Sequence, residues 1–222
     1  LELRIAAYLA NEPRMIEEFE RNENVHSNVT KLIFEVDEDA VNWKLCRAAT
    51  KIYDFGRLLY GGSLEGIFRR ILLKVPEVGL TLAALKKIDM QLHEVYPALF
   101  RWQRRILKEV ESTRKIANAF GRARIFRGSE DEIKREGLNH PIQSTAADII
   151  NEALIRIDEK LAVGHFILLQ IHDELVGECP ETEAATLNGL MKEEMERPVF
   201  INDILREFPT EGKIGHDWKE LK

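Results

Sequence analysis

Residues 167–176 read Ile-Leu-Leu-Gln-Ile-His-Asp-Glu-Leu-Val, an apolar strand pattern that polar residues interrupt and that then resumes. The pattern predicts a buried β-hairpin with two adjacent carboxylates, Asp173 and Glu174, at its tip. Tight hairpins favour Asn-Gly or Asp-Gly there because the turn needs positive φ, and neighbouring carboxylates repel each other. A cation is therefore expected, and Mg²⁺ suits the pair because it takes one or two carboxylates and leaves positions for substrate phosphates. A solvated acidic turn explains the same residues equally well.

Composition indicates a globular protein. The chain has 222 residues, of which 45% are hydrophobic, enough for one large domain or two closely packed subdomains. No run approaches the ~20 apolar residues of a membrane span. The first residues carry Glu2 and Arg4, where a signal peptide would be uninterrupted. We therefore expect a cytoplasmic protein without a membrane partner.

Charge is unevenly distributed along the chain. The net charge of −6 argues against a nucleic-acid partner, but residues 101–127 contain nine basic and two acidic residues. From Asp173 onward, thirteen acidic residues stand against six basic ones. The basic segment can bind phosphates, although a basic helix is also common as a solvated face.

The periodicity predicts a class of α+β, with helices on one face of a small antiparallel sheet. The helix starting near Pro141 has Asn139 placed to cap it, and the helix ending at Tyr60 has Gly61 as a C-terminal cap. A bend is expected at Pro97. The predicted helices are 14–21, 26–34, 39–60, 86–117, 141–161 and 182–195, and a last strand is predicted at 212–221.

Two cations and an aromatic residue recur every four residues in the helix that ends at Tyr60. Arg47, Lys51 and Phe55 therefore project from one face. Like charges at this spacing cost roughly 0.2 to 0.5 kcal/mol, so the arrangement favours an anion such as a polyphosphate, with Phe55 available to stack on a base. A surface pair beside a core phenylalanine is the simpler alternative.

A second set of residues four apart contains Arg135, Asn139 and Gln143. Every base pair offers hydrogen-bond acceptors in the DNA minor groove, so donors at this spacing can check pair geometry without reading sequence. Helix capping by Asn139 with a solvated Gln143 is the alternative.

Taken together, these segments resemble the family A DNA polymerases, the group of bacterial DNA polymerase I and related phage replicases, over nearly the whole chain. Residues 170–174 are similar to the family's motif C, and residues 139–148 to its N-x-P-I-Q-G-T-A-A-D segment. Residues 121–124 resemble its G-R-R-R turn, and residues 215–218 its C-terminal strand. Motif B, on the fingers helix, is matched by Arg47, Lys51, Phe55, Gly56, Tyr60 and Gly61.

The resemblance implies a polymerase palm with an inserted helical fingers subdomain, in a bacterial cell or a phage-infected host. Residues 1–22 would begin the palm, 23–118 would form the fingers, and 119–222 would complete the palm. Asp173 and Glu174 would be catalytic and hold two Mg²⁺ ions. The deoxynucleoside triphosphate would contact Glu2, His26, Arg47, Lys51, Phe55 and Tyr60. Primer-template DNA would contact Arg122, Arg124, Arg135, Asn139, Gln143 and His172.

Two departures from the family pattern carry expectations of their own. Motif A of the family reads D-x-S-Q-[IL]-E-L-R, and its aspartate would lie four residues before Leu1. A two-metal mechanism needs that carboxylate, so we expect an upstream segment or a second polypeptide to supply motif A and the thumb. One extra residue also lies between Gly56 and Tyr60, and we expect a π-bulge to absorb it.

The expected function is template-directed DNA synthesis by two-metal phosphoryl transfer to a primer 3′-hydroxyl. A single-subunit phage RNA polymerase has a similar fingers helix, but it usually has His-Asp-Ser at motif C and tyrosine at the position of Phe55. A non-catalytic DNA-binding or assembly subunit would keep the grooves without the chemistry.

Overall fold

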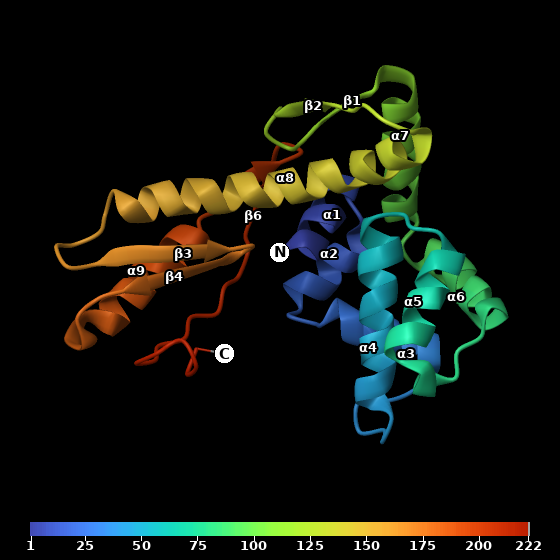
Figure 1. The fold of residues 1–222 in the computed structure, drawn as a ribbon, viewed down its shortest axis with the longest axis horizontal. Coiled ribbons are helices and arrows are strands. Elements are labelled where there is room, and N and C mark those ends of the chain that lie inside the picture. The colour runs from blue at the N-terminus through green and yellow to red at the C-terminus, as the bar shows by residue number, and fades with distance from the viewer. Residues whose placement is uncertain (222) are drawn as a thin grey trace. The chain divides into compact units, whose positions relative to one another are not determined.

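The computed structural model describes residues 1–221, which form two compact units. One unit is Glu2–Ile142, and the other contains residues 143–221 together with Leu1. The boundary falls within one long helix, α8 (Glu130–Asp158), directly after the pair Pro141 and Ile142 (Figure 1). Proline removes a hydrogen bond from a helix interior, so this helix is weakened where the units divide.

The unit Glu2–Ile142 is mainly helical. A short hairpin, β1 (Lys115–Ala117) and β2 (Ala123–Ile125), precedes α8. The helices before it are α1 (Glu2–Ala10), α2 (Pro13–Glu20), α3 (Val25–Phe34), α4 (Trp43–Tyr53), α5 (Leu64–Lys74), α6 (Leu82–Val95) and α7 (Pro97–Thr113).

Helix α1 lies in the core of this unit, against α2 and α7. Its residues Ile5, Ala6 and Ala7 are fully buried, which a helix with small side chains allows when neighbours approach closely. Helix α4 packs between α3 and α5. The predicted bend at Pro97 is confirmed as a break, because α6 ends at Val95 and α7 begins at Pro97.

The carboxylate of Glu12 holds the starts of two helices. Glu12 is 1% exposed and is the N-cap residue of α2, where its Oε1 accepts from the backbone N–H of Arg14 at 3.3 Å. Its Oε2 accepts from the backbone N–H groups of Ala98 and Leu99, at 2.7 and 3.2 Å, in the first turn of α7. These N–H groups have no partner within their own helices, so one buried side chain satisfies donors from two elements.

A π-helical turn, η1 (Asp54–Leu59), continues α4 and confirms the expected π-bulge. Gln103 Nε2 donates to two carbonyls of this turn, Arg57 O and Leu58 O, at 3.0 and 2.8 Å, and Arg57 O also accepts from the backbone N–H of Gly61 at 3.0 Å. Gly61 ends the segment with φ of +61°, as predicted for a C-terminal cap.

Helix α8 does not begin near Pro141, so the prediction that Asn139 caps it was wrong. The helix starts at Glu130 because Ser129 and Glu132 form a reciprocal capping pair. Ser129 N donates to Glu132 Oε2 at 3.0 Å, and Glu132 N donates to Ser129 Oγ at 3.4 Å. Asn139 and Pro141 consequently lie in the helix interior.

The second unit contains the end of α8, two hairpins and α9 (Ala184–Met195). Helix α9 confirms the prediction for residues 182–195. Buried Glu194 on α9 is paired with Arg156 and Lys160 of α8, with Arg156 Nε 2.9 Å from Glu194 Oε2. The hairpins are β3 (Phe166–Ile171) with β4 (Glu174–Glu178), and β5 (Val199–Ile201) with β6 (Ile204–Arg206).

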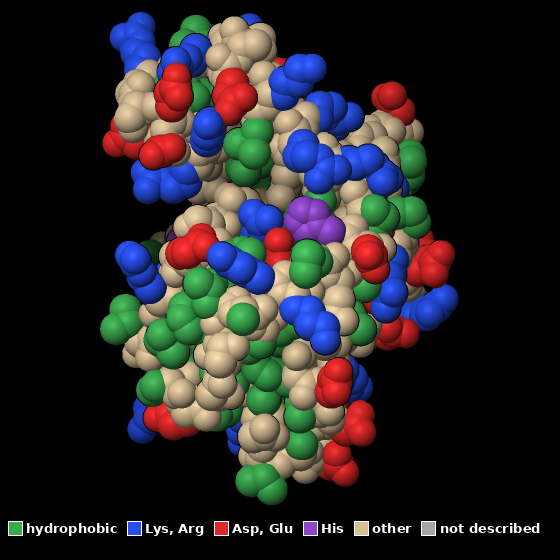
Figure 2. All heavy atoms as spheres, turned by 90° about the vertical axis from the view of Figure 1, so that its right-hand side faces the viewer, with side chains coloured by type: hydrophobic (Ala, Val, Ile, Leu, Met, Phe, Trp, Pro, Cys, Tyr) green, Lys and Arg blue, Asp and Glu red, His purple; other side chains and the backbone are tan. Residues whose placement is uncertain are grey.

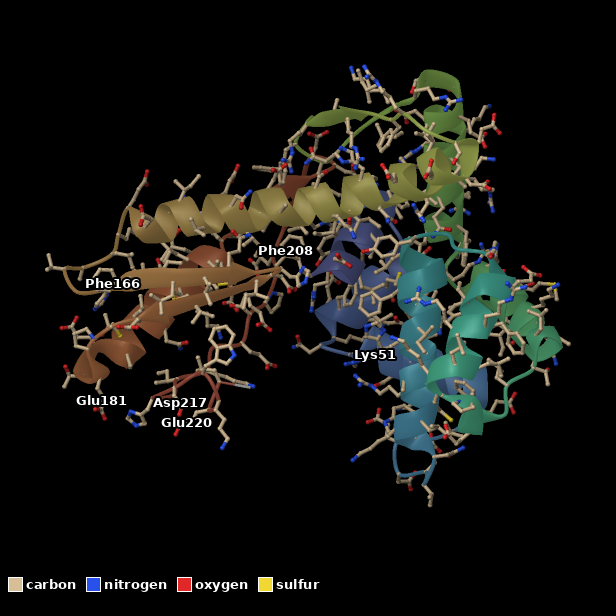
Figure 3. The ribbon with its side chains drawn as sticks, viewed as in Figure 1. Lys51, Phe166, Glu181, Phe208, Asp217 and Glu220 are labelled. Atoms are coloured by element: carbon tan, nitrogen blue, oxygen red, sulfur yellow. The ribbon has the colours of Figure 1, made fainter. Side chains whose placement is uncertain are left out.

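Two expectations for this unit were wrong. The β3–β4 hairpin is not buried, since Phe166, Leu168 and Leu169 are 56%, 50% and 48% exposed; Figure 3 labels Phe166. Residues 212–215 have no regular secondary structure and residues 216–221 form bends and turns, so no strand is present there. Apolar residues in a short segment predict a strand only if a neighbouring strand pairs with it, and β5 pairs with β6 instead.

The class is α+β, as predicted, with the described strands arranged as separate antiparallel hairpins. Among the helices of residues 1–221, none is both long enough and apolar enough to cross a membrane.

We predict that Glu12→Ala lowers the free energy of unfolding by about 3 kcal/mol, because it removes a helix cap and leaves buried N–H groups of α7 without acceptors. Urea unfolding followed by tryptophan fluorescence, to which buried Trp102 of α7 contributes, measures the change. Exposed Glu17, paired with Arg21 at 3.3 Å, is the matched control, and Glu17→Ala should cost about 0.5 kcal/mol or less. Equal losses in the two variants would contradict the capping role.

Candidate active site

Asp173 lies in a two-residue turn between β3 and β4. Ile171 pairs with Glu174, so the turn consists of His172 and Asp173, and Glu174 is the first residue of β4. The Asp173 side chain is 51% exposed, and its Oδ2 lies 3.7 Å from the amino nitrogen of Leu1. Both carboxylates are therefore accessible to solvent. Asp173 lies in the turn itself, and Glu174 lies in the strand that follows it.

His172 adopts an unusual backbone conformation for its residue type. Its φ is +56°, in the left-handed region that glycine tolerates and that costs other residues roughly 1 kcal/mol. A two-residue hairpin turn needs positive φ, and Asn202 and Asp203 in the β5–β6 turn have it too. The conformation of His172 therefore follows from the tight turn that carries Asp173.

The chemistry of the turn suits a hard cation. Asp173 and Glu174 offer carboxylate oxygens, the donors that Mg²⁺ takes, and their exposure leaves room for waters and phosphate oxygens. Across residues 1–221, no group of three His, Cys, Asp or Glu side chains is placed to hold a metal ion. The two carboxylates fit part of a magnesium site.

The predicted basic face on α4 is exposed and lacks internal counter-charges. Lys51, labelled in Figure 3, is exposed and Arg47 is half-buried. Neither forms an ion pair with a carboxylate within the part of the chain that the structure describes. Phe55, one turn further along, is 42% exposed. The face can therefore accept an anion beside an aromatic surface.

His26 comes from α3 to join this face. Its ring centroid lies 5.6 Å from that of Phe55, and its Nδ1 lies 2.6 Å from Asp54 Oδ2. Asp54 is fully buried, and burial raises the pKa of its carboxyl to about 6, against the opposing effect of His26. A buried acid, an imidazole and an aromatic ring thus lie together.

Tyr60 and Glu2, which the sequence suggested separately as nucleotide contacts, are hydrogen-bonded. The Tyr60 hydroxyl donates to Glu2 Oε2 at 2.6 Å. This contact ties the end of η1 to α1, although the two residues are far apart in the sequence.

The three residues predicted to face the minor groove all lie on α8, four residues apart. Arg135 and Gln143 are exposed, and Asn139 is half-buried, with an Oδ1 that has no hydrogen-bond partner among the described residues. Residues four apart in a helix lie on the same side, so these three residues share one side of α8.

The two arginines suggested as DNA contacts near β2 are placed differently. Arg124 is paired with Glu136 of α8 and lies over the Phe126 ring, 5.0 Å from its centroid. Arg122 is exposed in the turn before β2, and its carbonyl lies 3.3 Å from His140 Nε2.

Basic side chains also cover part of the surface away from these residues. Figure 2 shows many Lys and Arg side chains on the upper half of its face, the level of α7 and the β1–β2 hairpin in Figure 1. The exposed cations of α7 are Arg101, Arg104, Arg105 and Lys108.

Two residues near the site were missed by reasoning from the sequence. Gln103 gave no local signal, because the carbonyls it satisfies belong to another helix. Asp54 gave none either, because its partner His26 is 28 residues away on another helix.

Comparison with a family model, with curated proteins and with solved structures finds DNA polymerases in each case. The model of DNA polymerase family A matches residues 1–220. The thermostable DNA polymerase I of Thermus filiformis is 30% identical over 230 residues, and DNA polymerase I of Deinococcus radiodurans is 31% identical over 230 residues. Both matches include the whole of this chain, which spans about a quarter of the relatives' own length, 26% and 23%.

A solved structure agrees with this result. The POL domain of Pol1 from M. smegmatis, in complex with DNA primer-template and dNTP, has a TM-score of 0.78 and 28% identity. The similarity covers 92% of this chain and 36% of the other. With a family model matching residues 1–220 of 222, this chain belongs to DNA polymerase family A.

Proposed function

We propose that this chain performs template-directed DNA synthesis, adding deoxynucleotides to a primer 3′-hydroxyl, as the palm and fingers part of a larger enzyme. The observation that carries the proposal is the face formed by Arg47, Lys51, Phe55 and His26. Two cations without carboxylate partners lie there beside two rings, within the unit described. The similar M. smegmatis domain was solved with primer-template DNA and dNTP, which supports the same ligands here.

Each group on this face has a role that its chemistry fits. Arg47 and Lys51 would bind the triphosphate through charge-assisted hydrogen bonds. Phe55 would stack on the nucleotide and His26 would donate to a phosphate. Tyr60 and Glu2 are hydrogen-bonded at 2.6 Å. Tyr60 would lie near the template base, and Glu2 would crowd the 2′ position of the sugar.

Asp173 and Glu174 would hold Mg²⁺, with two ions in the complete site. Bound Mg²⁺ stabilises the charge that develops on a transferred phosphoryl group. A third carboxylate would complete the site. The nitrogen of Leu1 lies 3.7 Å from Asp173 Oδ2, so any segment that enters at Leu1 passes this carboxylate. We propose that such a segment, or a second polypeptide, supplies the motif A aspartate.

The remaining assignments concern the DNA and the subdomains. Arg135, Asn139 and Gln143 would follow the minor groove from α8, and His172 would contact the primer terminus. Arg122 and Arg124 would bind backbone phosphate, which for Arg124 requires exchange of its Glu136 partner. Residues 1–22 and 119–222 would form the palm and residues 23–118 the fingers.

We predict that Asp173→Asn, in the enzyme with its motif A segment present, abolishes primer extension, because it removes a metal ligand. Duplex binding should persist, since phosphate contacts carry most of the affinity. Asp203→Asn is the matched control, because Asp203 lies in the turn of the β5–β6 hairpin. Primer extension and a salt titration of DNA binding measure both properties. Residual synthesis above about a tenth of wild type would count against the metal role.

We predict that Arg47→Ala and Lys51→Ala each lower kcat/KM for the nucleotide by roughly 10- to 100-fold, because each removes a charge-assisted contact worth about 1.5 to 3 kcal/mol. Steady-state kinetics with a primed template measures the loss. Arg70→Ala, at an exposed site on α5, should change kcat/KM less than twofold. Similar losses in all three variants would indicate a general effect of net charge.

We also predict Mg²⁺-dependent synthesis by the 222-residue polypeptide only after a polypeptide with the D-x-S-Q segment is added, because Asp173 and Glu174 alone leave the metals under-coordinated. Gel-based primer extension with each component and with the mixture tests this. Robust synthesis by the purified 222-residue polypeptide alone would refute the need for a further carboxylate.

A further inference from the structure

Asp54 is a buried acid whose hydrogen bonding is incomplete. It is 0% exposed, and His26 Nδ1 lies 2.6 Å from one carboxylate oxygen, Oδ2. The other oxygen, Oδ1, is buried and has no hydrogen-bond partner among residues 1–221. An unpaired buried acceptor opposes folding, so a purely structural account of this side chain is incomplete.

Asp89, in the same unit, shows what a structural buried acid looks like. It is 6% exposed, and it accepts from the Tyr53 hydroxyl at 2.7 Å and from two nitrogens of Arg57 at 2.7 and 3.1 Å. Burial raises its pKa, but the hydrogen bonds from Arg57 and Tyr53 prevail, and the net shift is downward. The net pKa shift of Asp54 is upward, to about 6. Ionisation of Asp54 therefore lowers the stability of the folded protein, whereas ionisation of Asp89 raises it.

The position of His26 explains what an acid beside it could do. His26 is in the first turn of α3, which Asn24 caps, and a helix N-terminus disfavours a positive charge. Its side chain is 18% exposed, and its Nε2 makes no hydrogen bond within the described chain. With Nδ1 directed at Asp54, Nε2 on the opposite edge of the ring is the atom left for a ligand.

We propose that Asp54 is a positioning residue for nucleotide binding: it orients His26 and balances the imidazolium charge, so that Nε2–H donates to a phosphate of the incoming nucleotide. The inference rests on the proposed function and deepens it. The carboxylate offsets the unfavourable helix terminus, and the cations of α4 and the ring of Phe55 lie on the same face.

The charges around Asp54 are few. Elements α1, α4 and α5 pack against η1, yet among described residues His26 of α3 is the charged group that alters the Asp54 pKa. Burial raises the pKa values of the Tyr53 and Tyr96 phenols, and the Asp54 charge raises them a little further. Both phenols therefore stay neutral near neutral pH. Between pH 6 and pH 8, Asp54 is therefore the group of this site whose shifted pKa, about 6, bears on its charge.

Equilibrium binding of Mg²⁺–dATP and of inorganic tripolyphosphate tests the proposal without requiring catalysis. Titration calorimetry is done on wild type, Asp54→Asn, His26→Gln and the double variant at pH 6 and pH 8. Asparagine keeps a hydrogen-bond acceptor for Nδ1–H but removes the charge. The pKa of Asp54 is raised to about 6 by burial, so its carboxylate charge is present at pH 8 and about half lost at pH 6. Asp54→Asn should therefore raise the Kd about fivefold at pH 8 and less than twofold at pH 6.

The double variant separates positioning from other effects. If Asp54 acts through His26, Asp54→Asn should add nothing to the loss caused by His26→Gln. An unchanged Kd for Asp54→Asn at pH 8, or additive losses in the double variant, would overturn this inference alone. Failure of the wild type to bind either anion would overturn the proposed function and this inference together.

Thermal unfolding gives a second test. If Asp54 had a structural role, its replacement would lower the melting temperature at pH 8, whereas a positioning role predicts an increase. The Asp54 pKa is raised, so its contribution to stability is full below about pH 4 and is lost as the pH rises through about 6. Asp54→Asn should raise the melting temperature at pH 8 relative to wild type, and the gain should shrink at pH 5. Asp89→Asn, the matched control, should lower it at pH 8. A lower melting temperature for Asp54→Asn at pH 8 would make Asp54 a structural residue and contradict the proposal.

Discussion

The π-helical turn after α4 is the constraint on which the candidate nucleotide face depends. It takes up one residue more than the family pattern has between Gly56 and Tyr60, without breaking the helix that carries Lys51. Gln103 of α7 donates to two of its carbonyls and ties it to that helix. Within this turn Asp54 is buried beside His26, while the next residue, Phe55, remains exposed.

Buried carboxylates organise the unit that contains this turn. Glu12 joins the starts of α2 and α7, and Asp89 joins α6 to the end of α4 and to η1. Glu18 accepts from the Tyr96 hydroxyl at 3.2 Å, and burial raises its pKa. Each of these acids is compensated by donors from a distant element, which makes the packing specific. Asp54 is the exception whose compensation is partial, and the exception lies at the candidate site.

Much of the fold could be predicted where the signal is local. The helix expected at 26–34 is Val25–Phe34, and Gly61 has the positive φ of a cap. The start of α8 was misplaced because the prediction gave weight to Pro141 and not to the Ser-x-x-Glu capping pair, which begins twelve residues before it. The strand expected at 212–221 is absent from the described chain because strand formation depends on a partner, and local pattern contains no information about which segments pair.

The sequence by itself determined the residue types, their spacing and the family. Arg47, Lys51 and Phe55 share a face because helical periodicity is a local property, and the His-Asp-Glu run marks its hairpin turn for the same reason. The tertiary structure alone decided that Asp54 meets His26, 28 residues away, and that Tyr60 meets Glu2, 58 residues away. Such contacts depend on how helices pack and on which buried groups find partners. Those outcomes are set by the balance of burial and hydrogen bonding over the whole unit, and no local pattern encodes them.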